Sequence, residues 1–354
     1  METAVLSDAP SAAASLKDVE LPGGWVATEL VPRISSHTGG HYSVSYLALH
    51  KSGTKGFLKA LDYSRAFGSP DRALAINELT AAYLHERTIL ERCANRKLRR
   101  IVRAIDHGSV ALPGFALPVD YIVFERAEGD LRDQMDAMGE IDDLWRLRTL
   151  HQIATGMFEL HGSGIAHQDV KPSNILDFAA DGTKLGDLGR SACLAIPCPY
   201  DDVPVPGTRA YAPPELLYDR PLQDFDRRRF GCDAYLLGSM AVYLFLGCSA
   251  TAALLAQLDP QHRPEQWRDG FSAVLPYLKK AFGSVLGEIE ESLRPRPFGM
   301  EMVRVIAELC EPDPELRGHP GNRHTSTNRY SVERYVSIFD RLARRVEVSV
   351  LRTP

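Results

Sequence analysis

Residues 167–174 read HQDVKPSN, and this short stretch, together with the fifteen residues after it, decides the fold. It holds three polar groups at fixed spacing around one proline. Asp169 can accept a proton, Lys171 carries a positive charge and Asn174 offers an amide oxygen to a cation. Together these groups are suited to moving a phosphoryl group, since such a reaction needs charge neutralisation and positioning more than covalent chemistry.

The next residues, ILDFAADGTKLGDLG at 175–189, predict a hairpin. Two short apolar runs flank Asp181 and Gly182, a pair that is common in tight hairpin turns. The returning strand would bring Asp187 beside Asn174. A carboxylate and an amide oxygen suit Mg2+, a hard cation that takes oxygen ligands and keeps phosphate oxygens in its shell.

At this point the chain resembles the eukaryotic-type protein kinases. Residues 167–174 match the family's catalytic loop H-R-D-L-x-x-x-N, and Asp187-Leu188-Gly189 match its metal-binding D-F-G. The resemblance continues through GTRAYAPPE at 207–215, which is similar to the end of the family's activation segment. It implies that Asp233 begins a buried central helix and that Arg317 pairs with Glu215. By pattern it covers residues 23–345.

The resemblance also extends toward the N-terminus. Lys59 in KGFLKALD stands where the family has the lysine that grips the α and β phosphates of ATP. Glu86 in LHERTIL is the preferred helix partner of this lysine, with Glu78 as the alternative. In YIVFERAEGDL, the resemblance implies that Phe124 lies at the back of the adenine pocket. Two further residues would offer backbone groups to the base: Glu125 and Ala127.

The phosphate-covering loop departs from the family pattern. HTGGHYSV keeps glycine at Gly39, with Gly40 beside it, and keeps the family's valine at Val44. His37 and Tyr42 occupy the other two glycine positions. Glycine lets backbone amides approach phosphates closely, so bulkier residues predict a stiffer lid and weaker ATP binding.

Hydrophobic patterns outside these motifs divide the chain into two halves and predict an α+β fold. Short runs rich in Val, Tyr and Phe up to residue 125 predict strands around one helix at 71–93. The apolar stripe of this helix consists of Leu74, Leu79, Tyr83, Leu84, Ile89 and Leu90. Helical patterns dominate afterwards. With the resemblance, this predicts a bilobal kinase-like fold: a flexible tail at 1–22, an N-lobe with a small antiparallel sheet at 23–125, a mainly helical C-lobe at 126–345 and a C-terminal tail at 346–354.

The function implied by the resemblance is transfer of phosphate from ATP, with Mg2+, to protein hydroxyls. Asp169 would orient the hydroxyl and accept its proton, Lys171 would neutralise the moving phosphate, and Asn174 with Asp187 would hold the metal. Thr208 joins the catalytic candidates. Lys171 and Thr208 resemble Ser/Thr-directed members of the family, so a serine/threonine kinase is expected.

Two alternatives stay open. A small-molecule phosphotransferase of the antibiotic-kinase type shares the H-x-D loop, but such enzymes generally lack the A-P-E segment. A pseudokinase, a nucleotide-binding scaffold without activity, is suggested by the altered glycine loop and by Leu188 in place of Phe. The intact lysine, aspartates and asparagine count against it.

Composition places the chain among ordinary globular proteins, with 354 residues, 44% hydrophobic residues and 25% charged residues. A formal net charge of −5 gives no general attraction to nucleic acid or anionic membrane. Six scattered cysteines without C-x-x-C pairs fit a reducing cytoplasm. The uncharged run 234–258 is long enough to cross a bilayer, but Gly247 predicts a helix end within it, so two buried core helices are expected. The oligomeric state stays open.

The departures also bear on regulation. Gln168 stands where many family members carry an arginine that grips an activation-loop phosphate, and an amide cannot supply that charge. Residues 191–206 offer only Ser191 and Tyr200 as acceptors. We therefore expect activity without phosphorylation of this loop. The basic run Arg227–Arg229 is expected to be a solvated face.

Overall fold

The computed structural model describes residues 11–32, 43–138, 142–220, 222–323 and 328–351. The chain forms two compact units. The sheet unit consists of Met1–Asn95 and Val102–Ala127, and the helical unit consists of Arg96–Ile101 and Glu128–Pro354. Each unit is described by itself.

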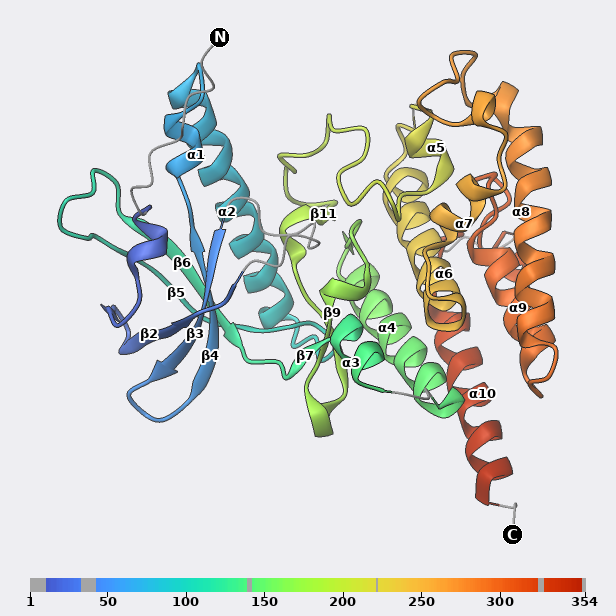
Figure 1. Ribbon diagram of the computed structural model, residues 1–354, viewed down its shortest axis with the longest axis horizontal. Coiled ribbons are helices and arrows are strands. Elements are labelled where there is room, and N and C mark those ends of the chain that lie inside the picture. Colours follow the sequence, from blue (N-terminus) through green and yellow to red (C-terminus); the bar gives the residue numbers. More distant parts are fainter. Residues whose placement is uncertain (1–10, 33–42, 139–141, 221, 324–327, 352–354) are drawn as a thin grey trace. The chain divides into compact units, whose positions relative to one another are not determined.

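The sheet unit is built on a six-stranded antiparallel sheet. Figure 1 labels its strands β2 to β6. Its strand order is β1-β2-β3-β4-β6-β5. The bounds are β1 Glu20–Leu21, β2 Trp25–Leu30, β3 Ser43–His50, β4 Lys55–Leu61, β5 Ala104–Val110 and β6 Val119–Glu125. The expected small antiparallel sheet is therefore confirmed.

The residues just before β5 do not extend the strand. Residues 99–101 lie outside the strand because their backbone groups serve the helical unit. The N–H groups of Arg99 and Arg100 both donate to the Glu159 carboxylate at 2.9 Å, and the carbonyl of Arg100 accepts from Leu185 at 2.8 Å. This short piece of chain consequently belongs to the helical unit.

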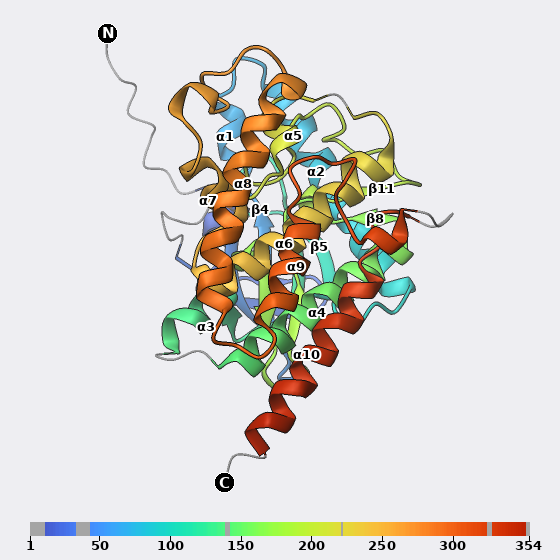
Figure 2. The same cartoon turned by 90° about the vertical axis from the view of Figure 1, so that its right-hand side faces the viewer.

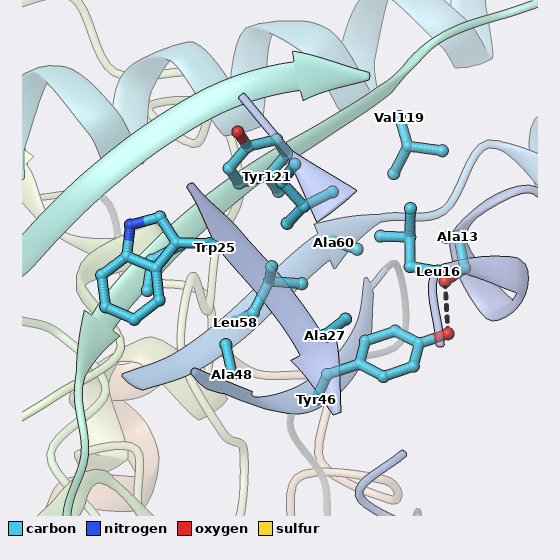
Figure 3. Close-up of a cluster of buried hydrophobic side chains, with 12 residues drawn as sticks. Ala13, Leu16, Trp25, Ala27, Tyr46, Ala48, Leu58, Ala60, Val119 and Tyr121 are labelled. Carbon is cyan, nitrogen blue, oxygen red and sulfur yellow. Dashed lines mark hydrogen bonds between the residues drawn. The ribbon is translucent and has the colours of Figure 1, made fainter. Parts of the chain in front are cut away.

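One face of the sheet carries a compact core of aromatic and aliphatic side chains, shown in Figure 3. Tyr46 is fully buried there, and its hydroxyl donates to the carbonyl of Ala13 at 2.8 Å. Leu16 is also fully buried. The prediction of a flexible tail up to residue 22 is thus wrong from residue 11 onward, because apolar side chains among the alanines and serines pack onto the sheet.

Two helices accompany the sheet: α1, Ser64–Phe67, and the long α2, Arg72–Asn95. The buried face of α2 includes Leu79, Glu86 and Ile89. Leu74 and Leu84, which the sequence places on the apolar stripe, are 53% and 42% exposed. At 100° per residue both leucines lie about 140° around the helix from Leu79, so they face away from the packed side.

The helical unit confirms the expected helix-rich second half. Its helices are α3 Leu131–Ala137, α4 Asp143–Gly162, α5 Pro214–Leu217, α6 Gly231–Leu246, α7 Ala250–Ala256, α8 Phe271–Leu293, α9 Gly299–Leu309 and α10 Glu333–Leu351. Figures 1 and 2 show α10 lying along α4. Because α10 continues to Leu351, residues 346–351 complete a helix and do not form the predicted tail.

α6 is the buried centre of this unit. It contacts α4, α7, α8 and α9, and nearly all of its residues are buried. It ends at Gly247, which adopts a left-handed conformation with φ of 77° that favours glycine. The side chain of Ser249 then caps α7 by accepting from the N–H of Ala252. The expected pair of core helices in this run is confirmed.

No single helix in the described ranges has the length and apolar character to span a membrane. One pair, Asp226–Leu246 with Ala250–Ala256, meets the criterion only when taken together and is bent by 76° at its break.

Short strands in the helical unit place the loops of interest. β9, Ile175–Asp177, pairs antiparallel with both β10, Thr183–Leu185, and β7, Gly129–Asp130. The predicted hairpin is confirmed, with Gly182 at φ of 72° in its turn. A second pair joins β8, Ile165–Ala166, to β11, Ala192–Cys193. These ladders fix the chain immediately before and after residues 167–174 and 187–191.

Candidate active site

In the sheet unit, Lys59 projects from β4 and meets Glu86 of α2. The Lys59 Nζ atom lies 3.1 Å from each oxygen of the Glu86 carboxylate. Glu78, the alternative partner, lies on the exposed side of the same helix. The two glutamates are eight positions apart, so only one of them can share the turn that faces Lys59.

The remaining candidates of this unit lie on strands or just after them. Val44 is half-buried on β3 in register with Ala60, and Phe124 is buried on β6. The N–H of Glu125 donates to the carbonyl of Arg103 at 3.0 Å, so any group that Glu125 offers to a base must be another one. Ala127 is half-buried. Gly39 and Gly40 lie outside the described residues.

In the helical unit, one buried carboxylate accepts two backbone N–H groups of the loop after β8. Asp233 in the first turn of α6 accepts the N–H of His167 at 2.8 Å and the N–H of Gln168 at 2.7 Å. His161 of α4 lies 2.9 Å from the same carboxylate through its Nε2. Asp233 lies at the start of a buried helix, as inferred from the sequence. From there it fixes the backbone next to Asp169.

The His167 side chain contacts backbone groups of the loop and does not reach solvent. It is fully buried, and its Nε2 lies 3.0 Å from the carbonyl of Gly186, just before Asp187. Its Nδ1 lies 3.3 Å from the N–H of Asp169. With Nδ1 as acceptor and Nε2 as donor, the ring joins the two segments that carry Asp169 and Asp187.

Asp169 lies at the centre of a small buried network. Its Oδ1 accepts the N–H of Thr208 at 2.8 Å, and its Oδ2 accepts from Lys171 Nζ at 2.9 Å. Lys171 also donates to the Thr208 hydroxyl at 2.8 Å. The structure thus brings together all three residues that the sequence predicts as catalytic. Hydrogen bonds to both carboxylate oxygens fix the orientation of the Asp169 side chain.

Gly207 makes this network possible, and sequence reasoning did not single it out. A Cβ atom at this position would overlap the carbonyl oxygen of Gln168 and would lie 3.0 Å from Oδ1 of Asp169. Only glycine allows the activation-segment backbone to approach the catalytic loop so closely. The signal was present in the sequence, since Gly207 begins GTRAYAPPE.

The two candidate metal ligands lie at the ends of the hairpin. Asn174 donates its side-chain N–H to the carbonyl of Asp169 at 2.8 Å. Its Oδ1 accepts from the Ser173 hydroxyl at 3.3 Å and is the atom that can also face a cation. The carbonyl of Asn174 accepts the N–H of Gly186 at 2.8 Å, and Asp187 comes next in a left-handed conformation with φ of 55°. An amide oxygen and a carboxylate fit Mg2+, whose remaining ligands would be phosphate and water.

Among the residues that the structure describes, no group of three or more His, Cys, Asp or Glu side chains has a metal-binding arrangement. The expected site does not depend on such a group, because Mg2+ bound with a nucleotide commonly uses one or two protein carboxylates or amides together with phosphates.

The activation segment ends on a buried ion pair. Arg317 donates from Nη1 and Nη2 to the two oxygens of Glu215, at 2.6 and 2.7 Å. Both side chains are essentially inaccessible, at 0% and 1% exposure. Burial lowers the pKa of Arg317, but the Glu215 carboxylate outweighs it and holds the pKa above its usual range. The pairing implied by the resemblance is present.

One basic residue contradicts the sequence interpretation. Arg229, expected on a solvated face, is buried, and its guanidinium donates to Gln168 and to Asp201. No motif marked it, because the run DRRRF resembles many exposed basic runs. Arg229 can be buried because Gln168, one residue before Asp169, accepts a hydrogen bond from its guanidinium.

Comparison with known proteins gives a consistent picture. A model of the family described as "Protein kinase domain" matches residues 39–320, which is well over half of the chain. A probable cell division protein kinase of Encephalitozoon cuniculi is 28% identical over 167 residues, covering 47% of this chain and 48% of that protein. A probable serine/threonine-protein kinase of Corynebacterium efficiens is 31% identical over 150 residues, covering 42% of this chain and 22% of that protein.

A third relative carries a broader description. A dual serine/threonine and tyrosine protein kinase of Strongylocentrotus purpuratus is 26% identical over 228 residues, covering 62% of this chain and 23% of that protein. The chain spans less than half the length of each of these relatives. The family match and the motifs at residues 167–174, 187–189 and 207–215 agree, and they establish that the chain belongs to the protein kinase domain family.

Proposed function

We propose that this protein kinase transfers the γ-phosphoryl group of ATP, with Mg2+, to serine or threonine hydroxyls of protein substrates. The observation that carries the proposal is the fixed carboxylate of Asp169, held by Lys171 on one oxygen and by the Thr208 N–H on the other. A preorganised carboxylate beside a buried ammonium group supplies the positioning and charge that phosphoryl transfer requires.

In this mechanism Asp169 orients the acceptor hydroxyl and takes its proton. The hydroxyl oxygen forms a bond to the γ-phosphorus, and the bond from that phosphorus to the leaving ADP oxygen breaks. Lys171, whose Nζ also contacts Thr208, is available to neutralise charge on the transferring group. Asp169 and Lys171 are both buried, and buried groups are weakly screened, so their electrostatic effect is stronger than in water.

Each unit has its own candidate residues for nucleotide and metal binding. Lys59, oriented by Glu86, would bind the α and β phosphates of ATP. Asn174 and Asp187 would hold Mg2+, which neutralises charge on the β and γ phosphates when bound. Glu86 contributes through Lys59, so it is a positioning residue.

Protein hydroxyls are favoured over small molecules by the activation segment. The buried pair of Glu215 and Arg317 stabilises the A-P-E end of this segment, a feature that antibiotic-type phosphotransferases generally lack. Lys171 and its contact with Thr208 support serine and threonine as acceptors. The serine/threonine description of the Corynebacterium efficiens relative points in the same direction.

The test uses the purified chain with γ-labelled ATP and three acceptors: a mixed protein acceptor, a tyrosine-only peptide and an aminoglycoside. We expect label on phosphoserine and phosphothreonine only, and its loss on chelation of Mg2+. Label on the aminoglycoside alone would refute a protein substrate, and label on tyrosine would refute Ser/Thr selectivity. A wild-type chain that binds Mg-ATP in a thermal-shift assay but labels nothing would identify a nucleotide-binding scaffold.

A further inference from the structure

Arg229 is a buried cation that the proposed phosphotransfer does not use directly. Its side chain is only 3% exposed and lies near the end of a π-helical turn, Asp226–Phe230, that leads into α6. Such turns are rare and often occur at functional sites. Its Nη1 donates to Oε1 of Gln168 at 2.5 Å, and its Nη2 donates to Oδ1 of Asp201 at 2.6 Å. A buried guanidinium is costly unless it is paired in this way.

Gln168 connects this guanidinium to the segment that carries Asp169 and to the segment that carries Asp187. Its backbone N–H donates to Asp233 at 2.7 Å, and its side-chain N–H donates to the carbonyl of Arg190 at 2.8 Å. Asp169 comes directly after it, and Arg190 comes directly after the Asp187-Leu188-Gly189 motif. Gln168 also adopts a left-handed conformation with φ of 64°, which fixed surroundings must maintain.

Asp201 supplies the anion from within the activation segment. Its side chain is 58% exposed, and its Oδ2 accepts the N–H of Cys198 at 3.4 Å. Next to this pair, Arg228 donates to the carbonyl of Val203 at 3.1 Å. Two neighbouring arginines in the turn before α6 therefore hold residues 198–203, Arg229 through the Asp201 carboxylate and Arg228 through the Val203 carbonyl.

Ser191, one of the two hydroxyl-bearing residues of 191–206, is not placed to supply a phosphate here. Ser191 is fully buried, and its hydroxyl donates to the carbonyl of Leu188 at 2.5 Å. The ring of Tyr200 lies under the Arg190 guanidinium, 4.2 Å from its carbon to the ring centre. The anion that meets Arg229 is the side-chain carboxylate of Asp201.

We propose that Arg229 is a positioning residue for phosphotransfer, and that it acts by clamping Asp201 of the activation segment to Gln168 of the catalytic loop. The clamp fixes Gln168, directly before Asp169, and through Gln168 the carbonyl of Arg190, three residues after Asp187, without any phosphorylation. The effect on catalysis rests on the proposed function, whereas the clamp itself is a property of the helical unit and can be measured without turnover.

The first test compares Asp201→Asn with Asp202→Asn, a matched change at the exposed neighbouring residue. Backbone hydrogen exchange of residues 191–206 is measured by mass spectrometry in the absence of nucleotide, and kcat and the KM for ATP are measured separately. Asp201→Asn should speed exchange and lower kcat about fivefold to tenfold, with the KM for ATP within about twofold, because it removes one charge-assisted contact that is partly open to water. Asp202→Asn should leave all three values at wild type.

The second test exchanges the side chains at positions 168 and 229, which are hydrogen-bonded to each other. Gln168→Arg alone places two guanidinium groups side by side, so it should lower kcat more than Asp201→Asn does. The double variant Gln168→Arg/Arg229→Gln restores one guanidinium and one amide, and it should recover most of the lost activity. A purely structural role for Arg229 predicts no recovery, since the double variant carries two changes in a buried place.

The outcomes separate this inference from the proposed function. Equal exchange and equal kcat in the two aspartate variants, no recovery in the double variant, or loss of activity after phosphatase treatment would overturn the clamp. A wild-type chain without phosphotransfer whose segment still loosens on Asp201→Asn would refute the proposed function and support the clamp.

Discussion

Glu215→Gln is the substitution for which the structure predicts the largest loss of stability. The Glu215 carboxylate has no access to water and accepts two short hydrogen bonds from Arg317. The guanidinium donates in addition to the carbonyls of Glu311 at 3.0 Å and Gly231 at 3.1 Å. An amide at position 215 keeps the shape of the side chain but removes the charge that offsets the buried cation.

The magnitude follows from burial. Breaking a buried ion pair by removing one partner costs about 3–5 kcal/mol, and the remaining amide oxygen of Gln still accepts one bond, so we expect about 3 kcal/mol. For a cooperative unit of roughly 150–250 residues this corresponds to a fall in Tm of about 6–12 °C. It is also a large fraction of the about 5–15 kcal/mol that usually stabilises a folded domain.

Urea unfolding followed by circular dichroism, with thermal scans in parallel, measures this loss. The matched control is Glu301→Gln, which removes a carboxylate paired with the half-exposed Arg341 and should cost less than about 1 kcal/mol. Replacing both buried partners, as in Glu215→Leu/Arg317→Met, should recover part of the loss, because no unpaired charge is left. Equal costs for Glu215→Gln and Glu301→Gln would refute the reasoning.

Three further predictions concern the candidate site and the pH dependence of stability. Gly207→Ala should lower both activity and stability, by about 1–3 kcal/mol, because its Cβ meets the catalytic-loop backbone, whereas Gly287→Ala on open space in α8 should be neutral or stabilising in the same unfolding assay. Glu86→Gln should weaken ATP binding measured by calorimetry, and Glu78→Gln on the exposed side of α2 should not. Burial is the main cause that lowers the pKa of His319 below its usual 6.5, so the folded state favours the neutral ring. The resulting stability is fully present above pH 6.5 and is lost as the pH falls below it. His319→Asn should therefore make the urea midpoint less dependent on pH below 6.5.

Strand and helix positions could be predicted where local pattern and tertiary packing agree. The hairpin around Gly182 follows from a glycine that suits a left-handed turn between two apolar runs. α2 could be placed, but its inner face was predicted only in part: Leu79, Ile89 and Leu90 are buried as the stripe predicts. Leu74 and Leu84 are apolar and exposed, while Glu86 is charged and buried. Glu86 faces inward because the ammonium group of Lys59 neutralises its charge. The spacing of apolar residues along a helix cannot reveal such a partner on another element.

Order in the N-terminal segment was missed for a similar reason. Residues 11–16 are rich in alanine and serine, which is typical of a tail, but Leu16 and Ala13 pack against the sheet and Tyr46 binds the carbonyl of Ala13. The partner lies about thirty residues away in the sequence, so no local rule reveals it.

The candidate site was predicted to the extent that its residues belong to motifs. Asp169, Lys171 and Thr208 could be predicted because the catalytic loop and the GTRAYAPPE segment each carry a recognisable pattern, and the three residues meet in the structure. Arg229 could not be found in this way. A basic run predicts a solvated face, and only the positions of Gln168 and Asp201, contributed by two other segments, turn it into a buried contact.

The most direct test of phosphoryl transfer by this chain is the initial rate of labelling of a protein acceptor by wild type and by Asp169→Asn, with Asp181→Asn at an exposed turn as the control. We predict that Asp169→Asn lowers the rate by about a hundredfold or more while the thermal shift caused by Mg-ATP persists, since the carboxylate acts on the acceptor hydroxyl and not on the nucleotide. Asp181→Asn should keep the wild-type rate. An Asp169→Asn chain that labels the acceptor as fast as wild type would contradict the assignment.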